Sequence, residues 1–169
     1  MEYDVREIRN YYDAKIREYD FNKLVGIGIS PNNAEFMVSV GVPEEYDEFV
    51  FYSIVDFQKL LIGGKPFIKI GHFTSSLYGL YVNEDGDEFF TSSSYHEPQV
   101  YMLNKNLETF FLFYLIRHEV STKMRKQGEY TSYNYARELS RLYEQIDPEA
   151  MKDVEGYWSH FIEDYETGL

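Results

Sequence analysis

Acidic side chains next to tyrosines are the residues of this sequence best suited to chemistry. They gather in two runs, which we call the first and second acidic segments: Glu44, Glu45, Asp47 and Glu48 in the first, and Glu84, Asp85, Asp87 and Glu88 in the second. Carboxylates bind Lys and Arg on a partner, and tyrosine, an amphipathic aromatic, is enriched at protein interfaces. We therefore predict a partner-binding surface built from both segments together with Tyr46 and Tyr95. The alternative interpretation is that the segments are solvated turns and the tyrosines belong to the core and the sheet surface.

Motifs for covalent or phosphate chemistry are missing from the sequence. Cysteine is absent, which excludes disulfides and thiolate chemistry. There is no Gly-x-Ser-x-Gly elbow and no phosphate-binding lysine loop, and the Gly26-x-Gly28 pair lacks the third glycine of a dinucleotide site. The 29 acids allow too many carboxylate pairs for a glycosidase pair to be chosen. We expect a protein that is not an enzyme and carries no cofactor.

The four histidines are too far apart in sequence to form a local metal motif. They are His72, His96, His118 and His160, and none lies within four residues of another. The pair His118-Glu119 has no second histidine four positions later, so the zinc-protease pattern fails. A site assembled from distant histidines stays open as an alternative. His72 lies in an apolar run, which favours a hydrogen-bonded structural residue.

The charge balance restricts the class of partner. A formal net charge of −13 argues against direct binding to nucleic acid, which requires Lys and Arg to neutralise phosphates. The same charge favours solubility and fast capture of a basic partner. The first six residues are charged and lack the apolar region of a secretory signal. We expect a cytoplasmic protein that binds a basic protein partner, with no nucleic acid or membrane as a direct partner.

The elements that must position these residues centre on positions 65–119. Aromatic and β-branched runs at 67–70, 77–82, 87–90 and 99–103 predict an antiparallel meander, with a turn at 83–86. A helix follows, capped by Asn104 or Asn106. It is apolar on all sides from Phe110 to Ile116, yet it is too short to span a bilayer. The C-terminal residues are expected to cover its outer face.

The flanking regions complete an α+β fold, with a mainly antiparallel sheet flanked by helices. The apolar spacing predicts these elements: a helix over 3–23, a loop or short strand at 21–30, a helix over 34–40 that Gly41 ends, an acidic loop at 44–48, strands at 49–52 and 57–62, and a helix over 131–146. A last helix, capped by Asp153, is expected to carry Trp158, Phe161, Ile162 and Tyr165, with Trp158, Phe161 and Ile162 buried. The length of 169 residues predicts one domain over 1–169. The core is expected to include Phe110, Phe111, Tyr114 and Leu115.

Several of these segments resemble the SUKH superfamily, most closely the fourth subgroup of SUKH immunity proteins. The helix and Val-Gly-Val-Pro run of 34–43 resembles the opening of that family, and Ile68-Lys69-Ile70-Gly71 is similar to its glycine-ended strand. The run 80–86 resembles its next strand and turn. The helix start at 103–110 and the Asp147-Pro148 pair followed by Trp158 are also similar. Gly41, Pro43, Gly71, Asn106 and Trp158 are the matched positions, and we interpret them as structural.

The resemblance implies an α+β fold and a bacterial cytoplasmic immunity protein. Such a protein neutralises a toxin from neighbouring cells, in many cases one that acts on nucleic acids, by binding the toxin and occluding its active site. A regulatory interaction scaffold of the same superfamily is the alternative function. A hydrolase that uses scattered acids is a third possibility. A large secreted protein with a variable C-terminal domain, encoded upstream, would favour the immunity function.

Overall fold

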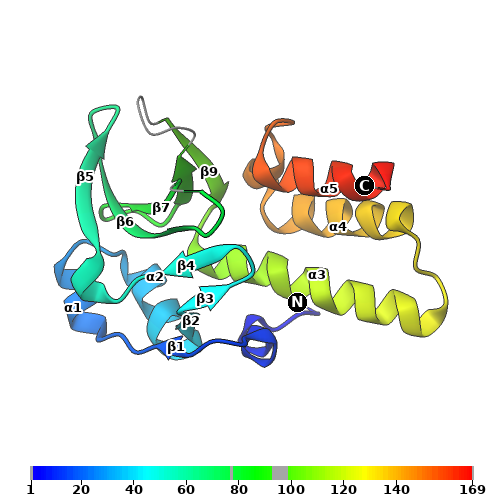
Figure 1. The fold of residues 1–169 in the computed structure, drawn as a ribbon, viewed down its shortest axis with the longest axis horizontal. Helices are drawn as coiled ribbons and strands as arrows, with labels where there is room; N and C mark the ends of the chain where they lie inside the picture. Colours follow the sequence, from blue (N-terminus) through cyan, green and yellow to red (C-terminus); the bar gives the residue numbers. More distant parts are fainter. Residues whose placement is uncertain (1, 77, 93–98, 169) are drawn as a thin grey trace.

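The structure, a computed structural model, describes residues 2–76, 78–92 and 99–168 (Figure 1). Its main sheet follows the order β3-β4-β6-β7-β8-β9, with β5 added to β6, and every pairing is antiparallel. Its strands have these bounds: β3 (Glu45–Tyr46), β4 (Phe49–Phe51), β5 (Gln58–Ile62), β6 (Lys65–Phe73), β7 (Gly79–Asn83), β8 (Phe89–Ser92) and β9 (Val100–Asn104). The predicted antiparallel meander is thereby confirmed, as is the α+β class; position 77 lies outside the described residues.

Strand β6 is long enough to serve three neighbours. It pairs with β7 through one edge, while β5 and β4 pair with successive parts of β6. Gly63 and Gly64 both have positive φ in the tight turn between β5 and β6. A Cβ at Gly71 would collide with the carbonyl oxygen of Val50, so this glycine lets β4 approach β6 closely.

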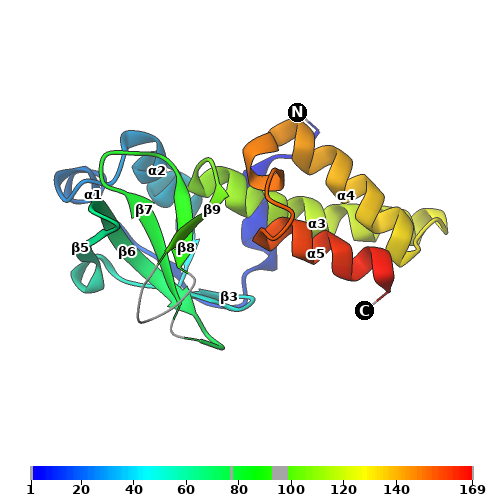
Figure 2. The same ribbon diagram turned by 90° about the horizontal axis from the view of Figure 1, so that it is seen from above.

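Helix α3 (Leu107–Gln127) is the axis on which the other elements pack. Figures 1 and 2 show its N-terminal half next to the sheet and its C-terminal half next to α4 (Ser132–Ile146) and α5 (Tyr157–Thr167). Asn106 caps the helix by accepting the Thr109 N–H at 2.7 Å, and Gly128 ends it with a φ of 70°. All residues from Phe110 to Ile116 are buried, so the predicted helix and its core residues are confirmed.

The C-terminal region covers α3, as the apolar helix required. The Trp158 ring is fully buried and contacts Phe110, Phe113 and Tyr143. Its indole N–H donates to the Asn104 side chain at 2.8 Å. The 3-10 helix η4 (Pro148–Met151) follows Asp147, whose carboxylate accepts from the Lys105 backbone at 2.8 Å and from Ala150 at its own cap.

Two details of this region differ from the prediction. Phe161 is only partly buried. Asp153 does not cap α5. Its carboxylate accepts the backbone N–H of Glu155, which precedes the helix, and Gly156 occupies the N-cap position.

The predicted helix over 3–23 is wrong. The segment forms a 3-10 helix η1 (Val5–Tyr11), a strand β1 (Ile16–Arg17) paired with β2 (Val42–Pro43), and then helix α1 (Phe21–Gly26). The apolar residues at helical spacing contact different neighbours. The Tyr12 hydroxyl donates to the Gly41 carbonyl at 3.5 Å, and the Tyr19 hydroxyl donates to the Tyr52 carbonyl at 2.5 Å.

Two further predictions around this region are corrected. Residues 21–26 are helical and not a loop or strand, because Asp20 caps them by accepting the Lys23 N–H at 2.9 Å. The predicted acidic loop at 44–48 is a β-hairpin: β3 and β4 are joined by a tight turn in which Asp47 has a φ of 54°. Strand β5 begins at Gln58, after the short helix η3 (Ile54–Asp56).

The helix predicted over 34–40 is present but starts earlier. Helix α2 (Pro31–Phe36) begins after the Ser30 cap and continues as η2 (Met37–Gly41), where Gly41 with a φ of 95° ends it. One contiguous core cluster joins residues of η1, the sheet, α3, α4 and α5. Of the helices in the described ranges, none combines the length and apolar character needed to cross a membrane.

Candidate functional site: a cleft beside the β3–β4 hairpin

The two acidic segments lie at opposite ends of the sheet. The first is the β3–β4 hairpin, at the end of β6 that carries Phe73. The second is the β7–β8 turn, at the other end of β6, where Phe67 faces Asn83. The six residue steps of β6 from Phe67 to Phe73 span about 20 Å at roughly 3.3 Å per residue. The two segments therefore do not form one surface, contrary to the way the sequence grouped them. Tyr95 lies outside the described residues.

The second acidic segment holds its own turn together. Glu84 pairs with Lys59 at 3.3 Å, Asp87 accepts from Asn32 at 3.1 Å, and Glu88 accepts from Asn83 at 3.3 Å. The backbone N–H of Asp85 donates to the Gly28 carbonyl at 2.7 Å, which fixes the turn against the residues that follow α1. Three of the four acids thus have partners within the chain, on β5, in α2 and beside the turn, which agrees with the structural interpretation of this segment.

In the first acidic segment, three acids have a hydrogen bond or ion pair within the chain and one has none among the described residues. Glu44 lies 3.6 Å from Arg17, and Glu48 accepts the Tyr157 hydroxyl at 3.2 Å. Tyr46 is buried, with its hydroxyl 2.7 Å from His118 Nε2.

Asp47 accepts the Tyr114 hydroxyl at 3.2 Å and lies 3.6 Å from Arg117. Glu45 is exposed and, among the described residues, has no hydrogen bond or ion pair from its side chain. Glu45 is therefore the acid of this segment that stays available to a partner.

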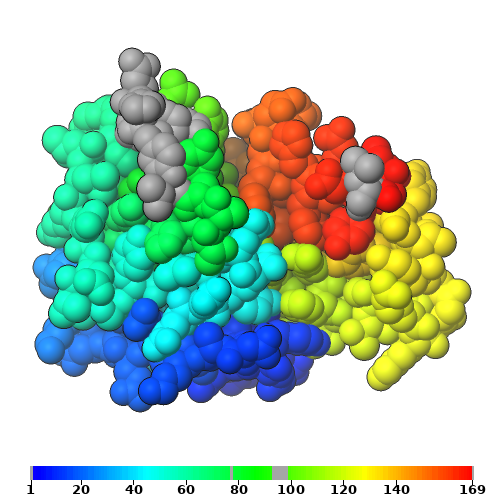
Figure 3. Space-filling view, viewed as in Figure 1, coloured from blue at the N-terminus to red at the C-terminus, as the bar shows by residue number. Residues whose placement is uncertain are grey.

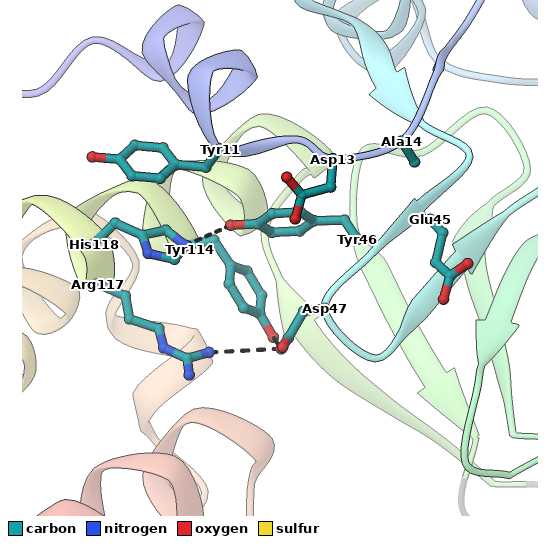
Figure 4. A pocket seen from close by; sticks show the side chains of 9 residues that line it. All are labelled: Tyr11, Asp13, Ala14, Glu45, Tyr46, Asp47, Tyr114, Arg117 and His118. Atoms are coloured by element: carbon teal, nitrogen blue, oxygen red, sulfur yellow. Dashed lines mark hydrogen bonds and ion pairs between the residues drawn. The ribbon is translucent and has the colours of Figure 1, made fainter.

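A cleft of about 510 Å³ opens beside this hairpin. Three parts of the chain form it: the end of η1 with the residues that follow it, the hairpin, and the middle of α3 (Figure 4). Its lining consists of Tyr11, Asp13, Ala14, Glu45, Tyr46, Asp47, Tyr114, Arg117 and His118. Figure 3 shows the same three parts, in blue, cyan and yellow-green, meeting on one face of the molecule.

The positive groups of the cleft are already neutralised. Besides its ion pair with Asp47, the Arg117 guanidinium lies 4.5 Å from the centre of the Phe161 ring and 5.6 Å from that of Tyr114. Burial, and then the nearby Arg117 charge, hold the pKa of His118 below its ordinary value of 6.5. His118 is therefore neutral at pH 7, stacked on Tyr11 at a centroid distance of 4.3 Å.

Two tyrosine hydroxyls fix the hairpin to the helices. Tyr114 on α3 and Tyr157 on α5 lie with their oxygens 2.5 Å apart, and they bond to Asp47 and Glu48 respectively. Burial raises the pKa of both tyrosines far above the ordinary value of 10.0, so both stay neutral donors at every physiological pH. The acids of the hairpin turn are consequently held in one position before any partner arrives, which lowers the cost of binding.

Asp13 is the second acid of the cleft without a partner. It is exposed, and no hydrogen bond or ion pair joins it to the residues that the structure describes. Figure 4 shows its carboxylate near the Tyr46 ring, with Asp47 and Glu45 on the hairpin side of the cleft. The lining thus contains three carboxylates, one guanidinium and a neutral imidazole, and this balance of charge favours a cationic ligand over an anionic one.

Sequence reasoning found Glu45, Tyr46 and Asp47 of this cleft and missed Tyr11, Asp13, Arg117 and His118. Tyr11 and Glu119, joined by a 3.1 Å hydrogen bond, are 108 positions apart in the chain. The apolar periodicity of 3–23 placed Tyr11 and Asp13 in a helix, and no local spacing pattern singles out His118. His72 is hydrogen-bonded to Tyr52 at 2.6 Å, as predicted. Among the described residues, no group of three or more acids and histidines is placed to hold a metal ion.

Comparisons with known proteins identify no relative. No family model matches the chain, and no match is found among curated proteins or solved structures.

Proposed function

We propose that this protein is a non-catalytic immunity protein of the SUKH type, which binds a basic toxin domain and occludes its active site. The observation that carries the proposal is the preformed acidic cleft at the β3–β4 hairpin, on a chain with a net charge of −13. Two of its carboxylates, Asp13 and Glu45, have no partner among the described residues, so they remain available for a cationic surface.

The bonding pattern of the cleft favours binding over catalysis. A general base must reach a substrate proton, and a nucleophile needs a base beside it. Here the His118 ring is bonded to Tyr46, and the Tyr114 and Tyr157 hydroxyls are occupied by Asp47 and Glu48. These groups fix one another, and such rigidity suits a surface that must match a partner.

Occlusion follows from the class of toxin that the resemblance implies. An enzyme that acts on nucleic acid presents Lys and Arg along its substrate channel, because phosphates must be neutralised. An acidic protein surface can occupy that channel in place of the substrate. The charges at the rim then act mainly on the rate of association, while a few buried contacts set the rate of dissociation.

The test is binding to the toxin domain encoded beside the gene of this protein, measured by surface plasmon resonance at about 50 mM and about 200 mM salt. We expect association to slow at the higher salt, since exposed charges are screened over about 8–10 Å at physiological ionic strength. Co-expression should also relieve the growth arrest that the domain causes. Absence of binding at both salt concentrations, or binding without protection of growth, would refute the proposal.

The position of the binding surface has a separate control. The β7–β8 turn carries a comparable set of acids at the opposite end of the sheet. Neutralising its two exposed acids with the variant Asp85→Asn/Glu88→Gln removes as much charge as the variant Asp13→Asn/Glu45→Gln does. We expect only the second variant to slow association several-fold, and an equal effect of both would show that the cleft is not the contact.

A further inference from the structure

Strand β5 has an unpaired edge. Of the described strands only β6 pairs with it, and Figure 1 shows β5 at the outer side of the sheet. Ile62 and Lys65 flank the tight turn between β5 and β6, so they form a hydrogen-bonded pair, and such pairs alternate along an antiparallel ladder. The next pair, Leu61 and Pro66, is therefore not hydrogen-bonded. In agreement, the Pro66 carbonyl accepts the backbone N–H of Glu84 on the other side of β6.

Two residues of β5 consequently direct their backbone N–H and C=O groups away from β6. They are Lys59 and Leu61, because the alternation makes Leu60 a hydrogen-bonded partner of Phe67. No other backbone hydrogen bond joins Lys59 or Leu61 to the part of the chain that the structure describes. The Leu61 side chain is 70% exposed, although it belongs to the sheet. An open edge with an exposed apolar side chain is suited to pairing with another strand.

The charge around β5 differs from that of the rest of the chain. From position 57 to position 83 the sequence contains no Asp or Glu, while the whole chain has 29 acids. Two copies of a protein with a net charge of −13 repel each other, and they approach most easily through surfaces that lack carboxylates. The charge of Lys59 is offset within the chain, because its ammonium lies 3.3 Å from Glu84. A basic partner gains nothing from such an edge, so the absence of acids favours a second copy of this chain as its occupant.

The edge of β5 is complementary to itself. With a two-fold axis beside Leu60, antiparallel pairing places Lys59 of one copy opposite Leu61 of the other, and these are the residues whose backbone groups point outward. Each such pair exchanges both of its hydrogen bonds. The long aliphatic stem of Lys59 then covers the exposed Leu61 side chain, and the two Leu60 side chains meet on the opposite face. A shift of one residue would instead align backbone groups that already bond to β6.

The same register brings opposite charges together beyond the strand. It directs the turn at 63–65 of one copy toward η3 of the other, which carries Val55 and Asp56. Lys65 is exposed and has no ion pair among the described residues, and Val55 is 85% exposed. The Asp56 carboxylate accepts the Ser53 hydroxyl at 3.1 Å and pairs with no cation among the described residues. The dimer would give both Lys65 and Asp56 a partner of opposite charge.

We propose that the protein forms a two-fold symmetric dimer in which the β5 strands of two copies pair antiparallel, centred on Leu60, and join the two sheets. This contact is independent of the proposed function, since the acidic cleft belongs to the β3–β4 hairpin, which pairs with the other end of β6. A strand of five residues offers less area than a standard interface, so the dimer dissociates on dilution. A strand of a different protein is the alternative occupant.

The first experiment measures the mass of the protein in solution by sedimentation equilibrium from about 1 μM to about 1 mM. We expect the mass to rise from that of one chain to that of two. Leu61→Lys should raise the dissociation constant at least about tenfold, because the two-fold axis places each new ammonium opposite a Lys59 side chain. Val154→Lys introduces the same charge in the turn before α5, at a position 75% exposed, and should dimerise like the wild type. Both positions are exposed, so the melting temperatures should stay unchanged.

Two outcomes of this experiment would overturn the proposal. One is a wild type that remains monomeric over the whole range, which would leave the edge of β5 to a strand of a different protein. The other is a Leu61→Lys variant that dimerises as tightly as the wild type, which would place the contact elsewhere on the molecule.

The second experiment tests the register and detects a weak dimer, because the chain contains no cysteine. Cα atoms opposed in a pair without hydrogen bonds lie about 4.5 Å apart, within the range of about 4.4–6.8 Å that a disulfide spans. Leu60→Cys should therefore cross-link two copies under mild oxidation. Leu61→Cys is the control, because the strand rise and spacing put its two Cα atoms about 8 Å apart. Non-reducing electrophoresis gives the readout, and equal cross-linking of both variants, or none with Leu60→Cys, would refute the pairing.

Discussion

At the scale of single residues, Phe111 shows how tightly aromatic rings fill the centre of this protein. Its side chain is fully buried, and its ring lies 5.4 Å from that of Phe36, 5.5 Å from that of Phe51 and 5.2 Å from that of Phe110. Protein interiors are close-packed, so a side chain removed from such a place leaves a cavity that its neighbours fill only in part.

We predict that Phe111→Ala lowers the free energy of unfolding by about 3–5 kcal/mol, the usual cost of deleting a buried phenylalanine. The measurement is urea denaturation followed by circular dichroism. Val55→Ala is the control, because Val55 is 85% exposed and its truncation should change stability by less than about 0.5 kcal/mol. A loss below about 1 kcal/mol for Phe111→Ala would contradict the packing described here.

His118 gives the protein a pH-dependent contribution to stability. Its pKa is lowered in the folded protein, first by burial and then by the charge of Arg117, while Asp47 and Glu119 act in the opposite direction. The unfolded chain therefore binds the proton first as the pH falls. The contribution of the neutral ring is fully present above its unfolded pKa, near 6.5, and is lost as the pH drops through the folded pKa.

We therefore expect the wild type to lose more stability between about pH 7.5 and about pH 5.5 than the variant His118→Gln, which cannot titrate there. The glutamine amide keeps a polar group near the Tyr46 hydroxyl. Parallel pH profiles for the wild type and His118→Gln would show that this ring does not titrate with folding.

The residues that carry the resemblance are structural in the molecule, as the sequence suggested. Gly41 has a positive φ, Gly71 leaves room for a neighbouring carbonyl, and Asn106 caps α3. Such local roles leave a mark on the sequence, because one residue type satisfies them. The cleft leaves none, since Asp13, Glu45 and Arg117 are ordinary charged residues until the fold brings them together.

At the scale of elements, the strands and helices with a single dominant neighbour were predictable. The meander and helices α3 and α4 follow their hydrophobic patterns and capping residues closely, because each turns one consistent surface to the core. For the segment 3–23 the same kind of pattern gave a wrong prediction. Its apolar positions have helical spacing, yet Ile16 pairs in a strand and Tyr19 bonds to Tyr52 on the sheet side. In this segment the contacts with distant parts of the chain decide the structure, and the helical spacing of the apolar residues does not.

Helix α5 is an integral part of the fold, because it closes the outer face of α3. We predict that deleting residues 153–169 removes Trp158 from its contacts with Phe110 and Phe113 and exposes the apolar surface of α3. The truncated protein should aggregate, as judged by light scattering after expression and purification. Deleting 166–169, beyond the last buried residue of α5, is the control and should leave the protein soluble. A soluble 153–169 truncation with an unchanged melting temperature would refute this role of α5.

At the scale of the whole molecule, α3 joins two regions that look separate in Figure 1. The sheet lies along one half of the helix, and α4 and α5 lie along the other. The core continues between them. The centroid of the Phe110 ring lies 4.9 Å from that of Phe89 in the sheet and 6.0 Å from that of Trp158 in α5. The acidic hairpin belongs to the sheet, and it is bonded to α3 through Tyr114 and to α5 through Tyr157. The cleft therefore depends on the two regions keeping a fixed relative position.

This continuity predicts a single cooperative unfolding transition. Trp158 is the only tryptophan of the chain, and its fluorescence reports the junction of α3 and α5. Circular dichroism in the far ultraviolet reports all helices and strands, and the ring resonances of His72 report the sheet. Because one core serves both regions, the three probes should give the same midpoint in urea, as two-state unfolding requires. An earlier transition of the Trp158 fluorescence would instead show that α4 and α5 detach on their own. The hairpin acids would then lose one of their two anchors before the sheet unfolds.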